Sequence, residues 1–252
     1  MTCYNGGKQR IGKKLADIIY DESLDIEDDY DFTIKGYCEP FCGMLGVYQH
    51  IPELFDDHKP KLNYKAGDIN KSVIKMWQAS QKGWKPPTLV NEGEFNRLKK
   101  STIDSAAKGY IGHQYSYGGQ YFEGYSPKYG KSQDTSVQSE RVCNIAKKLK
   151  NVTFNPGIYT QYSNLKGYVI YCDPPYPNTY YKHYNSGSDG KVEFDHDNFW
   201  SWCRKMSKDN IIFVSSYTTP KDFEKIFSSS HTLTGANVGE KKKRIEKLFL
   251  IY

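Results

Sequence analysis

The chain has 252 residues, 38% of them hydrophobic, which is enough for one large domain or for a core domain with a smaller insertion. The mean hydropathy of -0.74 and the lack of any apolar run near the roughly 20 residues of a transmembrane helix exclude a protein that spans a membrane. No apolar stretch follows Met1, so we expect a cytoplasmic protein without a secretory signal.

The first part of the chain predicts helices and strands in turn. Apolar residues recur on one face of a helix predicted over 11–20, and the strongly acidic stretch 21–31 is expected to be a solvated loop. A strand over 32–38 then runs into a glycine-containing turn over 39–46.

A weaker strand over 61–64 ends near Asp68, and a helix over 69–81 follows it. Four residues of this helix are expected to face inward: Ile69, Val73, Met76 and Trp77. The stretch 109–130 is rich in glycine and aromatic residues without helical period, so hairpins and loops are predicted there. A helical pattern returns over 139–149.

The remaining elements alternate in the same way: an apolar strand over 167–172, a polar loop over 177–191, a helix over 195–206 capped by Asp195, and strands over 210–214 and 247–252. Such alternation predicts an α/β fold, a mostly parallel sheet with helices on both faces. Ligands bind such sheets outside the carboxyl ends of the strands. Gly43, Asp68 and Asp173 all fall at expected strand ends.

The cysteines give no sign of a metal site or a disulfide framework. There are six of them: Cys3, Cys38, Cys42, Cys143, Cys172 and Cys203. They form no C-x-x-C pair, and no nearby histidines complete a zinc pattern. We therefore expect reduced, mostly buried thiols and no metal.

The net charge of +6 has a definite location. Between Ser80 and Lys150 there are 12 Lys and Arg against 6 Asp and Glu, a difference of +6 that equals the excess of the whole chain. A locally basic surface suits a polyanionic partner, although lysines often only solvate a surface.

The most specific motif is Asp173-Pro174-Pro175-Tyr176, directly after an apolar strand. Proline donates no backbone N–H, so two prolines end the strand and make a rigid corner. The corner holds one carboxylate and one aromatic ring in a fixed relation. Taken alone, it can also be an ordinary rigid turn.

Such a corner suits methylation of an adenine amine, whose lone pair is delocalised into the ring. The carboxylate and a backbone carbonyl can accept its two N–H bonds and stabilise the positive charge that grows on nitrogen. The ring of Tyr176 can stack on the base and hold it for in-line attack. The target atom is inaccessible within a duplex, so the base must be flipped out.

Taken together, the chain resembles the Dam-like N6-adenine DNA methyltransferases over nearly its whole length. The matching segments occur in that group's order: Asn5-Gly6-Gly7-Lys8, Glu39-Pro40-Phe41-Cys42-Gly43, Gly67-Asp68-Ile69-Asn70, Asp173-Pro174-Pro175-Tyr176, Ser215-Ser216-Tyr217 and Arg244-x-Glu246-Lys247-Leu248. The resemblance implies a Rossmann-like S-adenosylmethionine-dependent methyltransferase sheet. It also implies a catalytic domain formed by residues 1–79 and 151–252, with an inserted target-recognition domain over 80–150.

The resemblance further implies a binding site for S-adenosylmethionine. Cofactor-binding roles fall on Tyr4, Gly6, Gly7, Lys8, Glu39, Phe41, Gly43, Asp68 and Asp173. Asp68 would accept hydrogen bonds from the ribose hydroxyls, or cap the following helix, or do both. Asp173, Pro174, Pro175 and Tyr176 would be the catalytic residues. The glycines and Lys8 alone would fit a plain flexible turn equally well.

Two positions depart from the group's pattern. A second glycine often follows two places after the first in the cofactor turn, and here that residue is Leu45, with Gly46 one place later. An acid that contacts the cofactor adenine is missing around Ile158. Either a backbone group or Asn155 takes its place, or the affinity for the cofactor is modest.

The basic insertion is expected to contact double-stranded DNA. The residues assigned to it and to the neighbouring loops are Arg97, Lys99, Lys100, Lys108, Tyr117, Lys128, Tyr181 and Arg244. The cations would contact phosphates, and an aromatic ring would fill the gap left by a flipped base. The aromatic residues of this segment can instead pack into a small core of their own.

Several other functions fit parts of the pattern. The acceptor can be cytosine N4, an RNA adenine or a protein glutamine amide, although Asp173 as first residue of the motif favours adenine. A catalytically silent DNA-binding relative would keep the same fold. A dinucleotide oxidoreductase would need the G-x-G-x-x-G motif, which is absent. Monomer and homodimer both remain open, as do the recognition sequence and the biological role, a restriction partner among them.

Overall fold

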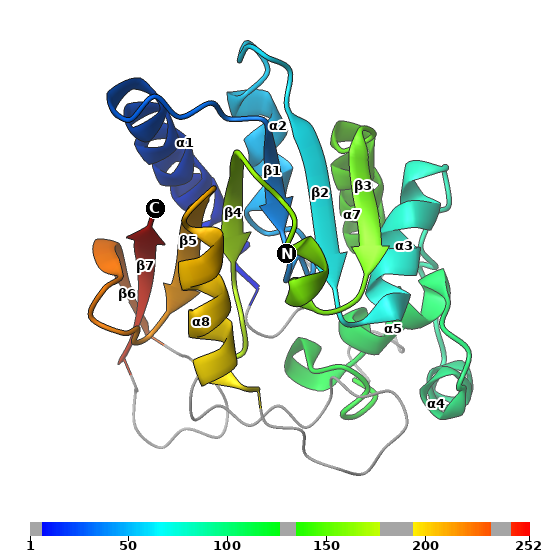
Figure 1. The fold of residues 1–252 in the computed structure, drawn as a ribbon. Coiled ribbons are helices and arrows are strands. Elements are labelled where there is room, and N and C mark those ends of the chain that lie inside the picture. Colours follow the sequence, from blue (N-terminus) through cyan, green and yellow to red (C-terminus); the bar gives the residue numbers. More distant parts are fainter. Residues whose placement is uncertain (1–6, 127–134, 177–193, 233–242) are drawn as a thin grey trace.

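A seven-stranded sheet is the centre of the structure, a computed structural model that describes residues 7–126, 135–176, 194–232 and 243–252 (Figure 1). The strands are β1 (Gly36–Glu39), β2 (Asn63–Asp68), β3 (Val152–Pro156), β4 (Tyr168–Cys172), β5 (Ile211–Ser216), β6 (Glu224–Thr232) and β7 (Lys243–Ile251). Their order across the sheet is β3-β2-β1-β4-β5-β7-β6.

Strands β1 to β5 pair in parallel, and β7 runs antiparallel between β5 and β6. The expected mostly parallel sheet is therefore confirmed. The carboxyl ends of the parallel strands point to the bottom of Figure 1, so residues that follow β2, β1 and β4 meet at one edge.

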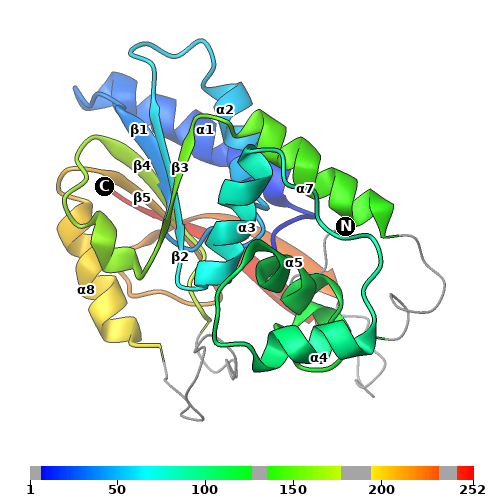
Figure 2. The same ribbon diagram turned by 90° about the vertical axis from the view of Figure 1, so that its right-hand side faces the viewer.

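Helices cover both faces of the sheet, as expected for an α/β fold (Figure 2). The helices are α1 (Gly12–Asp29), η1 (Tyr48–His50), α2 (Ile51–Leu54), α3 (Lys71–Gln81), α4 (Glu92–Lys100), α5 (Ala106–Gln114), η2 (Tyr117–Gly119), α7 (Ser136–Lys148), η3 (Tyr159–Tyr162) and α8 (His196–Met206). In Figure 2, α8 covers one face, and α1, α3 and α7 cover the other.

Alternation along the strands explains the two layers of core. Ile211 and Phe213 of β5 belong to the cluster under α1, α3 and α7, whereas Ile212 and Val214 belong to the cluster under α8. Successive side chains of a strand point to opposite faces, so a strand covered on both faces is apolar throughout. β4 and β5 have this pattern and are fully buried.

The acidic stretch 21–31 is not the solvated loop that its charge predicts, because α1 continues to Asp29. Ser23 and Ile26 are buried on the inner face of this helix. Glu27 accepts a hydrogen bond from the Ile34 backbone N–H and contacts His58. The acids occupy the outer face of an amphipathic helix, a pattern that charge counting alone does not reveal.

The glycine-rich stretch 109–130 also differs from expectation at its start, because α5 extends to Gln114. Ser105 caps the helix by accepting a hydrogen bond from the Lys108 backbone N–H. Gly109 lets α5 lie close to α3, since a Cβ at this position would be 2.2 Å from the Ser72 carbonyl oxygen. Beyond the helix, a bridge between Ser116 and Tyr125 fits the expected turns.

The start of α3 corrects a further expectation. Ile69 was expected to face inward, but it is 43% exposed, because the helix begins only at Lys71. Asn70 is the cap, and its side chain accepts hydrogen bonds from the backbone N–H groups of Ser72 and Val73. Val73, Met76 and Trp77 are buried as predicted.

Over the residues that the structure describes, no helix combines the length and apolar character needed to cross a membrane. The same residues contain no group of three or more His, Cys, Asp or Glu placed to hold a metal ion. The described cysteines other than Cys143 are buried, and all are free thiols, in agreement with the sequence.

Candidate active site

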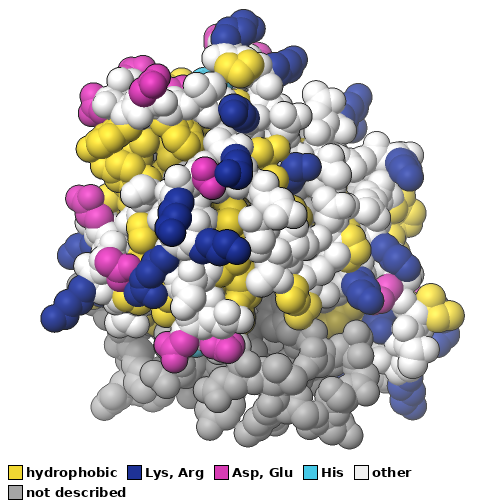
Figure 3. Space-filling view, in the orientation of Figure 1, with side chains coloured by type: hydrophobic (Ala, Val, Ile, Leu, Met, Phe, Trp, Pro, Cys, Tyr) yellow, Lys and Arg dark blue, Asp and Glu magenta, His cyan; other side chains and the backbone are white. Residues whose placement is uncertain are grey.

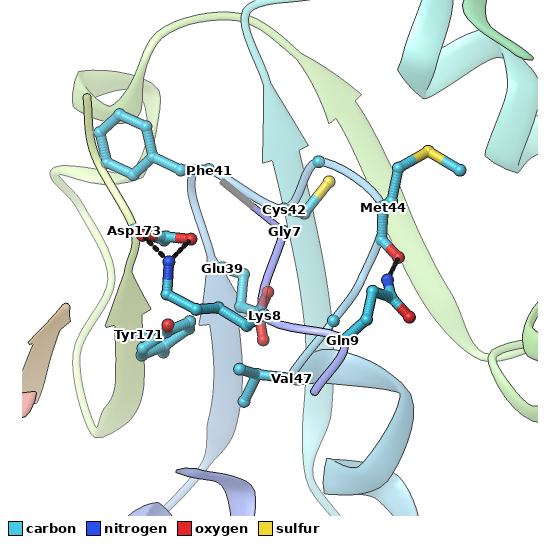
Figure 4. A pocket seen from close by; sticks show the side chains of 12 residues that line it. Gly7, Lys8, Gln9, Glu39, Phe41, Cys42, Met44, Val47, Tyr171 and Asp173 are labelled. Atoms are coloured by element: carbon cyan, nitrogen blue, oxygen red, sulfur yellow. Dashed lines mark hydrogen bonds and ion pairs between the residues drawn. The ribbon is translucent and has the colours of Figure 1, made fainter. Parts of the chain in front are cut away.

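Three neighbouring strands bring the candidate site together. β2 ends at Asp68, β1 at Glu39, and β4 immediately before Asp173, and β1 lies between the other two. A pocket at this edge is lined by Gly7, Lys8, Gln9, Glu39, Phe41, Cys42, Gly43, Met44, Gly46, Val47, Tyr171 and Asp173 (Figure 4). Residues from the N-terminal segment, β1 and β4 therefore share one cavity.

The turn after β1 is fixed by hydrogen bonds to both backbone groups of Gly43, its N–H and its carbonyl. The Gly43 N–H donates to the Asp68 carboxylate at 3.0 Å, and the Gly43 carbonyl accepts from the Trp77 indole N–H at 2.9 Å. Gly43 has φ of 43°, in the left-handed region that favours glycine. The turn is therefore pinned to both β2 and α3.

Leu45, the residue that departs from the resembled pattern, also adopts a left-handed conformation, with φ of 56°. This conformation costs a non-glycine residue roughly 1–2 kcal/mol. The Leu45 side chain is fully buried, and this packing offsets the cost. The turn thus keeps a left-handed backbone at this position without glycine.

Asp68 joins the turn to the start of α3. One carboxylate oxygen accepts from the Gly43 N–H, and the other accepts from the Asn70 N–H at 2.8 Å. Burial raises the pKa of Asp68 to about 6, although the two backbone donors act in the opposite direction. Each oxygen retains a further lone pair that can accept a hydrogen bond from a ligand.

Asp173 is held by Lys8, whose Nζ lies 2.7 Å from both carboxylate oxygens. The same Nζ lies 3.5 Å from Glu246 Oε1 and 5.1 Å from the centre of the Tyr176 ring. The Tyr176 hydroxyl donates a hydrogen bond to Glu246. We call Lys8, Asp173, Tyr176 and Glu246 the carboxylate cluster.

Exposure and pKa distinguish the members of the carboxylate cluster. The Asp173 side chain is 20% exposed, whereas those of Lys8 and Glu246 are 8% and 7% exposed, so Asp173 is the member most open to a ligand. Burial alone would lower the pKa of Lys8, but the charges of Asp173 and Glu246 outweigh burial and raise it. Burial raises the pKa of Asp173 against the opposing effect of Lys8.

The aromatic residues named from the sequence have defined partners. The Tyr176 ring packs edge-on against Tyr217, with 4.6 Å between ring centres. Phe41 stacks on Tyr159 at 5.7 Å and contacts Phe199 edge-on.

The Glu39 carboxylate accepts from the Tyr37 hydroxyl at 2.8 Å, and burial raises the pKa of Glu39 well above its ordinary value.

The remaining predicted site residues fall in different places. Tyr4, Gly6, Lys128 and Tyr181 lie outside the described residues, as does the side chain of Arg244 in β7. Arg97, Lys99 and Lys100 are exposed on the last turn of α4, where Arg97 pairs with Glu94. Tyr117 is 59% exposed.

Lys108 differs from the expectation of a DNA-contacting surface lysine. Its side chain is buried, and its ammonium group donates a hydrogen bond to the Ser101 carbonyl. In this structure Lys108 therefore tethers the loop before α5 and is not presented to a partner.

Glu246 is the site residue that sequence reasoning missed. It occurs in the Arg244-x-Glu246-Lys247-Leu248 segment, but nothing in that segment links it to Asp173 or to Lys8. The link arises because β7 inserts next to β5, which is itself paired with β4. Two signals were available in the sequence: the place of Glu246 in that matching segment, and an acid just before the apolar end of a strand.

The chain has a Rossmann-like α/β fold, and the pocket lies at the carboxyl edge of its parallel strands, where folds of this kind bind ligands. No protein-family model and no curated protein matches the sequence.

Solved structures that resemble the chain are distant. A candidate RNA methyltransferase from Pyrococcus horikoshii has 7% identity and a TM-score of 0.37, with 94% of this chain and 83% of that chain covered. The rRNA methyltransferase aviRa from Streptomyces viridochromogenes has 9% identity and a TM-score of 0.37, with 95% and 84% covered. A candidate methyltransferase complexed with SAH has 9% identity and a TM-score of 0.34, with 98% and 55% covered. Likenesses this distant leave the reaction to be argued from the site itself.

Proposed function

We propose that this protein transfers a methyl group from S-adenosylmethionine to the N6 amine of a flipped adenine in double-stranded DNA. One observation carries the proposal. Asp173, the most open carboxylate of its cluster, lines the same pocket as the Gly43 turn, whose N–H is bound by Asp68. A donor site and an acceptor carboxylate are thus adjacent, as methyl transfer requires.

The residues around Asp68 fit the donor. Its two carboxylate oxygens each keep a lone pair for a ribose hydroxyl. Ile69 and Ile158, which are 43% and 53% exposed, follow the adjacent strands β2 and β3 and offer apolar surface to a purine ring. Asn155 pairs with Gly67 across these strands, so it lies within the same region. When bound, S-adenosylmethionine supplies an electrophilic methyl group on a sulfonium sulfur.

The residues around Asp173 fit a conjugated amine. The carboxylate accepts an N–H of the amine and draws electron density toward nitrogen, where the new bond to carbon forms. The same carboxylate stabilises the positive charge that develops there, and it can accept the proton that the nitrogen then loses. Pro174 and Pro175 keep this geometry rigid, and the Tyr176 ring, which is 8% exposed, is held in a fixed orientation by its packing against Tyr217.

The segment 80–150 supports nucleic acid as the substrate. Arg97, Lys99 and Lys100 are exposed on α4, which lies with α5 at the same end of the molecule as the pocket edge of the sheet (Figure 1). Lys and Arg side chains lie on this part of the surface and are also scattered over the rest of the same face (Figure 3). Contacts of these cations with phosphates would bring a base to Asp173. The exposed Tyr117 is suited to fill a gap in the duplex.

Methyl incorporation tests the proposal directly. Purified protein is incubated with radiolabelled S-adenosylmethionine and, separately, with duplex DNA, structured RNA and an unrelated protein. We expect label in DNA, and we expect Asp173→Ala to reduce the rate at least about a hundredfold, because the carboxylate interacts most strongly with the transition state. Asp209→Ala, a change of an exposed aspartate paired with Lys166, is the control. Label in RNA or protein alone would contradict the assigned acceptor.

A further inference from the structure

Glu246 contacts two neighbours of Asp173. Its Oε1 accepts the Tyr176 hydroxyl and lies 3.5 Å from Lys8 Nζ. It comes from β7, whereas Asp173 and Tyr176 follow β4 and Lys8 precedes α1. Three separate segments of the chain thus converge on one buried carboxylate.

The geometry of Lys8 presents a chemical problem. Its ammonium group contacts both oxygens of Asp173 at 2.7 Å, so it occupies one lone pair on each oxygen and leaves a substrate amine only the remaining two. The ammonium group also withdraws electron density from the carboxylate, which weakens its pull on an amine N–H. Lys8 is 8% exposed, so it cannot leave Asp173 for water without opening the site.

We propose that Glu246 is a positioning residue that receives the Lys8 ammonium group and thereby frees Asp173 for the substrate amine. The proposal rests on the proposed function and names the group that regulates its catalytic carboxylate. Lys8 is already shared, so a shift from 2.7 Å contacts with Asp173 toward Glu246 needs only a small movement. Ionised Lys8, Asp173 and Glu246 carry one net negative charge, which matches the positive charge that develops on the amine.

The charged and titratable groups around Asp173 determine the direction in which the pKa of its carboxyl group should change. They are Lys8 and Glu246, together with Tyr176, Glu39 from the end of β1 and Tyr171 from β4. Lys8 lowers the pKa of Asp173 and the charge of Glu246 raises it. Burial raises the pKa of Glu39 and of Tyr171 well above their ordinary values. Removal of the charge on Glu246 therefore lowers the pKa of Asp173.

Carbon-13 NMR of aspartate-labelled protein tests this without relying on turnover. The Asp173 carboxyl signal is assigned by its loss in Asp173→Asn and is followed against pH. In Glu246→Gln we expect its titration to move down by about one pKa unit, because a like-charged neighbour is removed and Lys8 turns fully to Asp173. Glu224→Gln, the same change at an exposed residue of β6, should leave the titration unchanged.

Two further variants separate charge from shape. Tyr176→Phe keeps the charge of Glu246 but removes a hydroxyl whose hydrogen bond lowers the pKa of Asp173, so the Asp173 titration should move upward, opposite to its movement in Glu246→Gln. Glu246→Asp keeps the buried charge, and hence the fold, but withdraws it by one methylene, so an intermediate titration is expected. An unchanged titration in Glu246→Gln, or an equal downward shift in Tyr176→Phe, would overturn the proposal.

Kinetics give a second readout for the same variants. With nucleic acid as substrate, Glu246→Gln should lower kcat about tenfold and leave the dissociation constant of S-adenosylmethionine unchanged, because Glu246 acts at the acceptor side. A wild-type protein that transfers no methyl group would refute the proposed function while the titration still decides the role of Glu246. Loss of donor affinity in Glu246→Gln would indicate a general collapse of the site and would count against positioning.

Discussion

At the scale of single residues, Asp68 and Asp173 are two carboxylates with different surroundings. Asp68 accepts two backbone N–H donors, and Asp173 is bound by a buried ammonium group. Burial raises the pKa of both, for Asp68 to about 6. The difference lies in the bound partners. Neutral backbone donors suit Asp68 to neutral hydroxyl ligands, whereas the ion pair suits Asp173 to a ligand atom that becomes positive.

Donor binding should depend on the ionisation of Asp68. With a pKa of about 6, the carboxylate is ionised above that pH and protonated below it. A protonated Asp68 has fewer lone pairs for the ribose hydroxyls, so the affinity for S-adenosylmethionine should fall as the pH decreases through 6. Isothermal titration at several pH values from 5 to 8, a range that includes the pKa of about 6, measures this.

The matched variant for this measurement is Asp68→Asn. It should bind the donor about tenfold to a hundredfold more weakly at pH 8, because hydrogen bonds to a charged acceptor are lost. The pH dependence should disappear with the titrating group. If the variant kept the decline near pH 6, another group would be responsible.

The sequence allowed the strand-end residues Gly43, Asp68 and Asp173 to be predicted as a group, because the ends of parallel strands meet at one edge. The left-handed backbone at Leu45 could not be predicted, since leucine rarely adopts it. The burial of Lys108 could not be predicted either, because its partner is a backbone carbonyl.

At the scale of elements, the contact of α5 with α3 depends on a glycine. A Cβ at Gly109 would be 2.2 Å from the Ser72 carbonyl oxygen, a backbone atom that cannot turn away. Gly109→Ala should therefore destabilise the protein by about 1–3 kcal/mol, the usual cost of overpacking, and lower Tm in a thermal unfolding experiment.

The control is Gly93→Ala in the exposed first turn of α4, where the nearest atom is the Asn91 side-chain oxygen at 3.2 Å. Alanine favours the helix by up to about 1 kcal/mol over glycine, so Tm should stay constant or rise slightly. Equal Tm values for the two variants would show that α5 and α3 can separate without cost.

The basic last turn of α4 should contact phosphates. Lys99→Glu with Lys100→Glu should weaken DNA binding and reduce the slope of log affinity against log salt by about 2, because two phosphate contacts are lost. The control is Lys147→Glu with Lys148→Glu, the same change of charge on the last turn of α7. That turn leads into the start of β3, so it lies at the edge of the sheet opposite the pocket. A salt slope that is equal in both double variants would mean that α4 does not touch the backbone of DNA.

Most elements were predictable where the period of apolar residues was clear, as in α3, β4 and β5. β3 and β6 were missed, because β3 alternates buried Val152 and Phe154 with polar residues over only five positions and β6 contains three successive serines. Neither has a continuous apolar run. The apolar period predicts this first helix only over 11–20, because the acidic outer face of α1 obscures buried Ser23 and Ile26.

At the scale of the whole molecule, the sheet joins residues that the sequence separates widely. Lys8 and Asp173 are 165 positions apart, and Tyr176 and Glu246 are 70 apart. Their meeting follows from the strand order, in which β7 enters antiparallel beside β5. The alternation of elements predicted a parallel sheet but not this antiparallel insertion, which no local pattern encodes.

The domain division into residues 1–79 with 151–252 and an insertion over 80–150 remains a proposal about the whole molecule. Within residues 80–150, α7 packs against α3. Its Val142 and Ile145 belong to the core on the face of the sheet that α1, α3 and α7 cover. α4 and α5, in contrast, lie at the lower end of Figure 1, beyond the sheet. α4 and α5 are therefore the part of the insertion best placed to meet a substrate that is larger than the pocket.

Nucleoside analysis of cellular DNA tests the central claim most directly. The wild-type protein and Asp173→Ala are expressed in a host without adenine methylation of its own, and the DNA is digested and examined by mass spectrometry. The account predicts N6-methyldeoxyadenosine with the wild type and none with the variant. Unmodified DNA from cells that contain folded, donor-binding wild-type protein would contradict it.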